Sequence, residues 1–260
     1  MLLSSDDVEP FDVQGADGRS PFFIVCDHAG RLIPRSLGSL GLSEDQLASH
    51  IAWDAGAAVV ARRLGAALGA HTVCQRYSRL VIDCNRPQGA ADSIAPRSER
   101  TLVPGNQTVG PDAAQERAQE IFHPYHDEIR RALDRRAAEG RPTVLVAMHS
   151  FTPVFMDVPR PWHVGVLYNR DARMAAPLLR ALRAEGDLVV GENEPYAAGD
   201  LTDYSIVEHG EQRGLPYVEI EIRQDLIADG RGQDAWGERL ARLLAVAIAA
   251  LPTPTTPPSR

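Results

Sequence analysis

The chain has 260 residues, a formal net charge of −8 at pH 7, and 44% apolar residues. This length suits one large α/β domain or two small ones, with enough apolar residues for a full core. Acidic and basic residues are mixed along the chain, which argues against the basic surface that nucleic-acid or membrane-surface binding favours.

Residues 1–13 contain no basic segment and no sustained apolar stretch, so we expect no signal peptide. The apolar runs elsewhere fall far short of the ~20 residues of a membrane-spanning helix. Three cysteines, Cys26, Cys74 and Cys84, form no CxxC pair and lie within apolar stretches, which is typical of reduced, buried thiols. We therefore expect a cytoplasmic protein without a membrane partner.

Strand and helix patterns alternate along the chain after an irregular arm over residues 1–20. Short apolar runs predict strands at 22–26, 71–77, 79–85, 143–150, 163–169, 188–191 and 217–225. Helical spacing of apolar residues predicts helices that begin at Ser43 and Asp54, each as an N-cap, and helices over 111–140, 171–186 and 235–251. A long ordered loop over 86–112 is of the kind that often carries function.

This alternation predicts an α/β sheet with helices on both faces. The sequence has no internal repeat and no clear linker, so we expect one domain over residues 1–250 and a disordered Pro-rich tail over 251–260. In such sheets, ligands bind in the crevice outside the carboxyl ends of the strands. Residues at strand ends are therefore the first candidates for a functional site.

Four predicted strands end in side chains that can bind metal or move protons. They are Asp27 and His28 after 22–26; Asp83, Asn85 and Arg86 at 79–85; His149 and Ser150 at 143–150; and Glu219, Glu221 and Arg223 in 217–225. Two histidines at separate strand ends predict a pair of zinc ligands, and a third carboxylate ligand would leave an open, catalytic position. A nearby glutamate could take a proton from water at the zinc, and arginines could hold an anionic substrate or an oxyanion.

Structural interpretations of the same residues stay open. His28 and His149 could be hydrogen-bonded strand ends, Asp54 a helix cap, and Asp83 the ion-pair partner of Arg86. Other histidines, such as His126 in HPYHDE, are more typical of packing or of a surface than of metal binding. The coincidence of several such residues at strand ends is what favours a site.

Two glutamates in the last predicted strand strengthen this interpretation. Glu219 and Glu221 share one face of the strand, because side chains alternate. Leaving both unpaired in a dry interior would be costly, so at least one needs a metal, an arginine or water.

Seven stretches, in chain order from about Phe22 to Leu226, resemble the N-formylglutamate amidohydrolase family. They are CDHAGRLIP, AWDAGAAVVARRL, YSRLVIDCNRP, PYHDEI, MHSFTP, VGVLYNRD and YVEIEIRQDL. The resemblance implies a three-layer α/β/α sandwich with a mixed, mostly parallel sheet, like that of zinc carboxypeptidases and aspartoacylases. It also implies a hydrolase with one zinc ion that removes an N-formyl or similar N-acyl group from an acidic amino acid such as N-formylglutamate, as in histidine catabolism.

The resemblance implies that His28 and His149 bind the zinc ion. Carboxypeptidase-like enzymes have a ligand glutamate three residues after the first histidine, where this chain has Arg31. The third ligand must therefore come from elsewhere, and we expect Asp54, in the family-like segment AWDAGA. Two other candidates stay open: Asp27 and His126.

The resemblance also implies roles for the remaining candidates. Glu221 is the expected base, and a better match than Glu219, while Arg79 in YSRL is expected to assist the oxyanion. The pair formed by Asn85 and Arg86 matches the grip on a substrate carboxylate. The polar segment 191–205 is either a lid over the substrate or a solvated connection, and two tyrosines could reach in from it: Tyr204, our choice, or Tyr196.

Two alternatives to this function stay open. The strand after Glu221 reads IRQ, where we expect Asn-Arg in the closest formylglutamate enzymes, so another N-acyl amino acid or a small peptide could be the substrate. A non-catalytic small-molecule or metal-binding protein on the same scaffold is the other, although the candidate base argues against it. We expect a small-molecule partner and no nucleic acid or membrane, and a homo-oligomer stays open.

Overall fold

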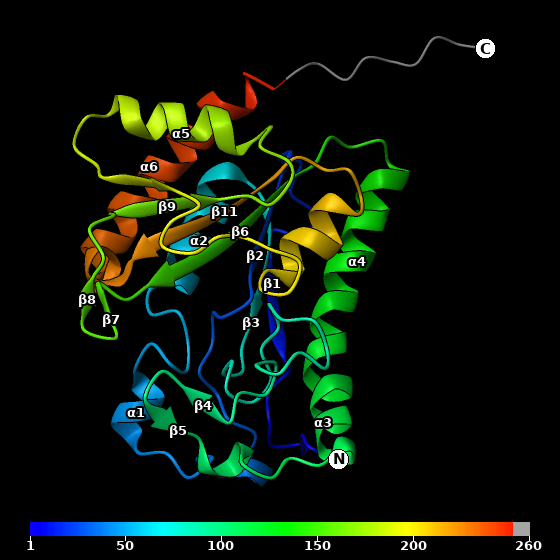
Figure 1. The fold of residues 1–260 in the computed structure, drawn as a ribbon. Helices are drawn as coiled ribbons and strands as arrows, with labels where there is room; N and C mark the ends of the chain where they lie inside the picture. Colours follow the sequence, from blue (N-terminus) through cyan, green and yellow to red (C-terminus); the bar gives the residue numbers. More distant parts are fainter. Residues whose placement is uncertain (252–260) are drawn as a thin grey trace.

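A computed structural model describes residues 1–251, and Figure 1 shows its fold. A seven-stranded sheet has the order β1-β3-β2-β6-β11-β9-β10. Its strands are β1 (Phe11–Gln14), β2 (Phe22–Cys26), β3 (His71–Gln75), β6 (Val144–Phe151), β9 (Val164–Leu167), β10 (Val190–Glu192) and β11 (Tyr217–Arg223). The pairs β1–β3 and β11–β9 are antiparallel, and the other four pairs are parallel.

Helices cover both faces of this sheet (Figure 1). The longer helices are α2 (Ala57–Leu68), α4 (His123–Ala138), α5 (Ala175–Ala184) and α6 (Gly230–Ile248). Helices α2, α5 and α6 pack on one face, and α4 lies over the other together with the π-helical turn η4 (Ile206–Glu211). The predicted three-layer α/β/α sandwich with a mixed, mostly parallel sheet is confirmed.

The core lies on both sides of the central strands. All eight residues of β6 are buried, as expected of a strand with parallel neighbours and helices on both faces. Alternation along β11 sends Ile220 and Ile222 into the core under α2 and α6, while Glu219 and Glu221 point to the opposite face. The register pairs Glu221 with His149 of β6, so these two side chains share one edge and one face.

The remaining elements are short. They are η1 (Arg35–Leu37), α1 (Glu44–Ala48), η2 (Pro104–Asn106), α3 (Pro111–Arg117), η3 (Ala118–Phe122), η5 (Gln224–Ile227), and the hairpins β4–β5 (Arg97–Ser98 and Thr101–Leu102) and β7–β8 (Val154–Phe155 and Val158–Pro159). Ser43 caps α1 as predicted, in a capping box with Gln46. Within residues 1–251, no helix has the length and apolarity needed to cross a membrane.

The strand predicted at 79–85 is wrong. The segment is buried, but it forms a chain of turns without strand neighbours. Its carbonyl groups are satisfied by side chains from later in the sequence: Asn106 donates to the carbonyl of Leu80, Arg117 to that of Val81, and His126 faces that of Cys84. An apolar segment can therefore lie in the core without pairing as a strand, provided that other donors form hydrogen bonds with its carbonyl groups.

Two smaller predictions also need correction. Asp54 does not cap a helix, because α2 begins after Gly56, whose φ of 82° is left-handed. The arm over residues 1–20 is not wholly irregular, since β1 pairs with β3 at the sheet edge. The three cysteines are free and buried, as expected.

One domain over residues 1–250 stays our inference, supported by a single sheet that carries both layers of the core. The tail predicted for 251–260 lies outside the described residues, apart from Leu251.

Candidate active site

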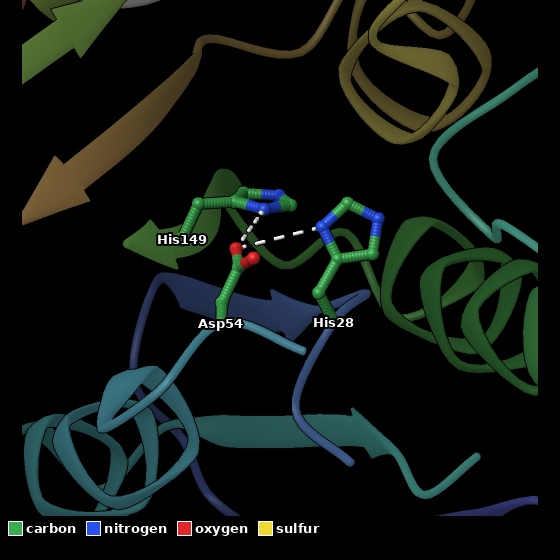
Figure 2. Close-up of side chains that lie close together, drawn as sticks. All are labelled: His28, Asp54 and His149. Carbon is green, nitrogen blue, oxygen red and sulfur yellow. Dashed lines mark hydrogen bonds and ion pairs between the residues drawn. The ribbon is translucent and has the colours of Figure 1, made fainter. Parts of the chain in front are cut away.

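His28, Asp54 and His149 converge above the carboxyl edge of the central strands (Figure 2). His28 follows β2, His149 lies in β6, and Asp54 comes from the segment before α2. One ligand atom from each lies within 4.8 Å of the others. Asp54 Oδ2 is 2.9 Å from His149 Nδ1 and 3.4 Å from His28 Nδ1. The structure therefore brings together the three residues predicted as metal ligands.

Backbone contacts fix these residues relative to one another. The amide of Asp54 donates to the carbonyl of His28 at 3.0 Å, which joins the two ligand-bearing segments directly. The amide of Ser150 donates to Asp54 Oδ2 at 3.2 Å, so the same carboxylate is held by the strand that carries His149. Asp54 thus owes its position to β2 and β6 rather than to a helix terminus.

Gly30 allows the chain to leave the site directly after His28. A Cβ atom on Gly30 would lie 1.9 Å from the carbonyl oxygen of Arg76, a rigid backbone atom. We expect Gly30→Ala to lower the free energy of unfolding by about 1–3 kcal/mol and to weaken metal binding, because the segment next to His28 must shift. Thermal unfolding and metal titration would measure both effects.

Gly230→Ala is the matched control, because no atom lies within 4 Å of the added Cβ and the backbone there needs no positive φ. Unchanged stability and metal affinity in Gly30→Ala would show that the turn after His28 tolerates a side chain.

A carboxylate stands behind each histidine. His28 Nε2 lies 2.7 Å from Asp83 Oδ1, and His149 Nε2 lies 3.3 Å from Asp27 Oδ2. Burial alone would raise the pKa of both carboxyls, but the histidines hold the pKa of Asp83 well below its ordinary value and lower that of Asp27. Ionised carboxylates accept hydrogen bonds, so they favour a proton on Nε2 of each histidine. The Nδ1 atoms, which face Asp54, are then the nitrogens available to bind a metal.

These residues fit a metal ion. His28 Nδ1 is buried and has no hydrogen-bond partner among residues 1–251. Ligands about 2 Å from a tetrahedral ion lie about 3.3 Å apart, and the two spacings from Asp54 Oδ2 bracket this value. A carboxylate behind a ligand histidine is the usual second partner in such sites. Two imidazoles and one carboxylate form a donor set that suits zinc and leaves a position for substrate.

The electrostatics of the cluster point the same way. Burial alone would lower the pKa of His149, but the surrounding carboxylates, Glu219 first, raise it well above its ordinary value. Burial would likewise raise the pKa of Asp54, yet its interactions with His28 and His149 hold it far below its ordinary value. The carboxylates around these groups thus favour positive charge at this place.

Glu221 lies next to His149 in the sheet register and lines the same cavity as the three candidate ligands. It is 5% exposed, and its Oε2 atom has no hydrogen-bond partner among the described residues. Burial raises the pKa of Glu221 to about 8, against the opposing effect of His149. A carboxyl group that exchanges its proton near neutral pH suits acid–base work. Glu219, one pleat further back, is also buried with an unpaired oxygen, and burial raises its pKa.

Arg79 contacts two carboxylates of the candidate site, Asp83 and Asp54. Its Nη2 atom donates to Asp83 at 2.9 Å, and Nη1 lies 3.5 Å from Asp54 Oδ1. Burial alone would lower the pKa of Arg79, but these two carboxylates outweigh it and raise the pKa. Asp83 therefore pairs with His28 and Arg79, while Arg86 forms its ion pair with Asp92, contrary to the simple Asp83–Arg86 pairing.

A cavity of about 480 Å³ opens in front of these groups. Its lining includes the predicted ligands and Glu221, together with Arg79, Asn85 and Arg86. Such a volume is typical of small-molecule sites. Two hydrogen bonds hold Asn85 in the cavity wall. Its backbone N–H donates to Asp83, and its side-chain Oδ1 accepts from the backbone N–H of Ser205.

Three other candidates, Tyr204, His126 and Asp27, do not line the cavity. Tyr204 is not part of the cavity lining and packs against His126 and Phe122, whereas Tyr196 does line the cavity. His126 Nδ1 lies 3.0 Å from His209 Nε2, and His126 is not part of the cluster formed by the three candidate ligands. The other alternative ligand, Asp27, contacts His149 from behind and accepts a hydrogen bond from Ser205 at 2.5 Å.

The sequence matches the N-formylglutamate amidohydrolase family over residues 20–228. The chain belongs to this family. Every residue that lines the cavity lies within the matched segment. The protein is therefore an amidohydrolase of the N-formylglutamate amidohydrolase type.

Solved structures agree with this membership. Gene product Atu2144 from Agrobacterium tumefaciens is 37% identical, with a TM-score of 0.93 over 96% of this chain and 99% of that chain. An N-formylglutamate amidohydrolase from Ralstonia eutropha JMP134 is 17% identical, with a TM-score of 0.67 over 94% of this chain and 98% of that one, and shares the fold. No protein of curated function matches the chain at a significant level.

Proposed function

We propose that this amidohydrolase is zinc-dependent and removes an N-formyl group from an acidic amino acid such as N-formylglutamate. The observation that carries the proposal is the convergence of two histidines and an aspartate at one cavity, which a buried glutamate of raised pKa also lines. A pure binding protein would need no proton acceptor at this place.

His28, Asp54 and His149 would hold one zinc ion. When bound, zinc would lower the pKa of a water molecule to about 7 and polarise the acyl carbonyl. Asp83 and Asp27 keep the imidazole rings oriented and in the required protonation state, which supports metal affinity. The free, buried cysteines are consistent with the reducing cytoplasm as the location.

Glu221 takes the proton from the attacking water and delivers it to the departing amine. Burial raises the pKa of Glu221 toward the neutral range, which suits a carboxyl group that must both accept and donate a proton. Arg79, fixed by Asp83, supplies positive charge beside the ligands where the oxyanion develops. This fixed placement means that little reorganisation is needed during the reaction.

Asn85 and Arg86 grip a carboxylate of the amino acid. Arg86 lines the cavity, where the exposed Asp92 is its counter-ion and the carbonyl of Thr202 is a further partner. A substrate carboxylate can replace Asp92, since an exposed ion pair contributes little to stability. Holding this end of the substrate positions its amide for attack.

A substrate panel tests the proposal. Zinc-loaded protein is expected to release formate from N-formyl-L-glutamate faster than it deacylates N-acetyl-L-glutamate, with N-formyl-L-aspartate and N-formyl-L-glutamine as further substrates. Faster release of acetate would assign the enzyme to another acyl group. Bound zinc without hydrolysis of any compound would instead favour a non-catalytic protein.

A further inference from the structure

Arg160 is a buried arginine beside the cavity that no part of the proposed mechanism uses. It follows the β7–β8 hairpin, which leaves β6 directly after the segment that carries His149. Arg160 is 8% exposed. Its guanidinium carbon lies 4.5 Å from the ring centre of Phe155, 4.7 Å from that of Tyr196 and 5.8 Å from that of Phe151.

Arg160 has no counter-ion among residues 1–251. No carboxylate of these residues lies within ion-pair distance of it, whereas Arg79 and Arg86 each have an aspartate partner. The aromatic rings compensate part of its charge, but a desolvated cation without an anion remains costly. This arrangement is suited to a negative charge that arrives from outside the chain.

Tyr196 connects Arg160 to the cavity. Arg160 Nη1 donates to the hydroxyl oxygen of Tyr196 at 2.8 Å, and Tyr196 lines the cavity. Because the oxygen accepts from the guanidinium, the hydroxyl proton is free to be donated elsewhere. Burial and the charge of Glu221 raise the pKa of Tyr196, so this proton stays in place at neutral pH. Donation from a cation makes the hydroxyl a stronger donor.

We propose that Tyr196, polarised by Arg160, binds a second carboxylate of the substrate, opposite the one held by Asn85 and Arg86. This inference rests on the proposed function and makes Tyr196 a specificity-determining residue, with Arg160 as its positioning residue. A permanent carboxylate fits better than the transient oxyanion. No carboxylate among the described residues pairs with Arg160, and Arg79 already lies beside the candidate metal ligand Asp54.

The test compares N-formyl-L-glutamate with N-formyl-L-glutamine, which differ in one carboxylate. For Tyr196→Phe and Arg160→Met, we expect kcat/KM for the glutamate compound to fall about 10- to 100-fold, mainly through KM. The glutamine compound should change less than about 3-fold. Arg160→Lys should recover part of the lost preference, because it restores a cationic donor. Arg183→Met, at an exposed ion pair with Glu192, is the control.

Equal losses for both compounds, or losses in kcat alone, would overturn the proposal, because Tyr196 would then serve the reacting centre or only the fold. Binding of the same two compounds to zinc-loaded Glu221→Gln protein, measured by calorimetry, gives a readout that needs no turnover. Unchanged binding preference in Tyr196→Phe on that background would also overturn it. Absence of hydrolysis by the unsubstituted protein would instead contradict the proposed function, so the two failures are distinct.

Discussion

Glu221→Gln is expected to lower kcat by about two to four orders of magnitude while the protein stays folded and binds metal. The amide keeps the size of the carboxyl group but cannot accept the proton that Glu221 would take from water. Folding should be unaffected or improved, because Glu221 is buried with an unpaired oxygen and its raised pKa shows that the fold disfavours its charge. Steady-state kinetics, elemental analysis for zinc and thermal unfolding together measure these outcomes.

Glu238→Gln is the control for this change, because Glu238 is exposed on α6. It should match the unsubstituted protein in all three measurements. Turnover by Glu221→Gln within about tenfold of the control would remove Glu221 as the base. Loss of zinc together with activity would mean that Glu221 supports the metal site instead.

Removal of a ligand histidine is expected to abolish stoichiometric metal binding. In His28→Ala, one of the three proposed protein ligands is missing, and Asp83 loses the largest of the interactions that lower its pKa. The unsubstituted protein should gain about 2.7 kcal/mol in unfolding free energy at a free zinc concentration of 100 Kd, and the variant should gain almost none. Zinc titration followed by thermal unfolding measures the difference without requiring turnover.

Two further variants sharpen this result. Asp83→Asn keeps all three ligands but weakens the hydrogen bond behind His28, so zinc affinity should fall about 10- to 100-fold. His123→Ala, which removes a histidine outside the cavity lining, should leave zinc binding unchanged. Full zinc stabilisation in His28→Ala would exclude His28 as a ligand.

The sequence was informative where a side chain's role follows from its position at the end of a buried strand. His149 can be placed at the sheet edge because β6 is an apolar run with polar residues near its end, and Glu221 because apolar residues alternate with two glutamates late in β11. His28 followed from the same rule. Asp54 was harder, since its expected role as a helix cap is wrong, and only contacts from two other strands explain its position.

Other features depended on contacts that no local pattern records. The turns around Asp83 are stabilised by side chains far along the chain, such as Asn106 and Arg117. The apolar residues at 79–85 alone predict a strand there, because they do not show these contacts. Tyr196 and Tyr204 lie in the same polar segment, and only the packing of Tyr204 against α4 decides which of them lines the cavity. No sequence pattern points to Arg160, because the observation that singles it out is spatial: no carboxylate of residues 1–251 lies within ion-pair distance of its guanidinium.

The expected catalytic residues lie on the sheet and the expected specificity residues on its connections, which has a consequence for how the substrate preference of this enzyme could change. The expected ligand His149 and base Glu221 sit on central strands, where any shift would disturb neighbours on both sides. Tyr196 and Phe155, by contrast, project into the cavity from a loop and a two-residue strand of a small hairpin. Substitutions or length changes in those two connections can alter which amino acid is accepted while the reaction itself is preserved. Relatives with this sheet and different connections would then form a series of enzymes with one chemistry and many substrates.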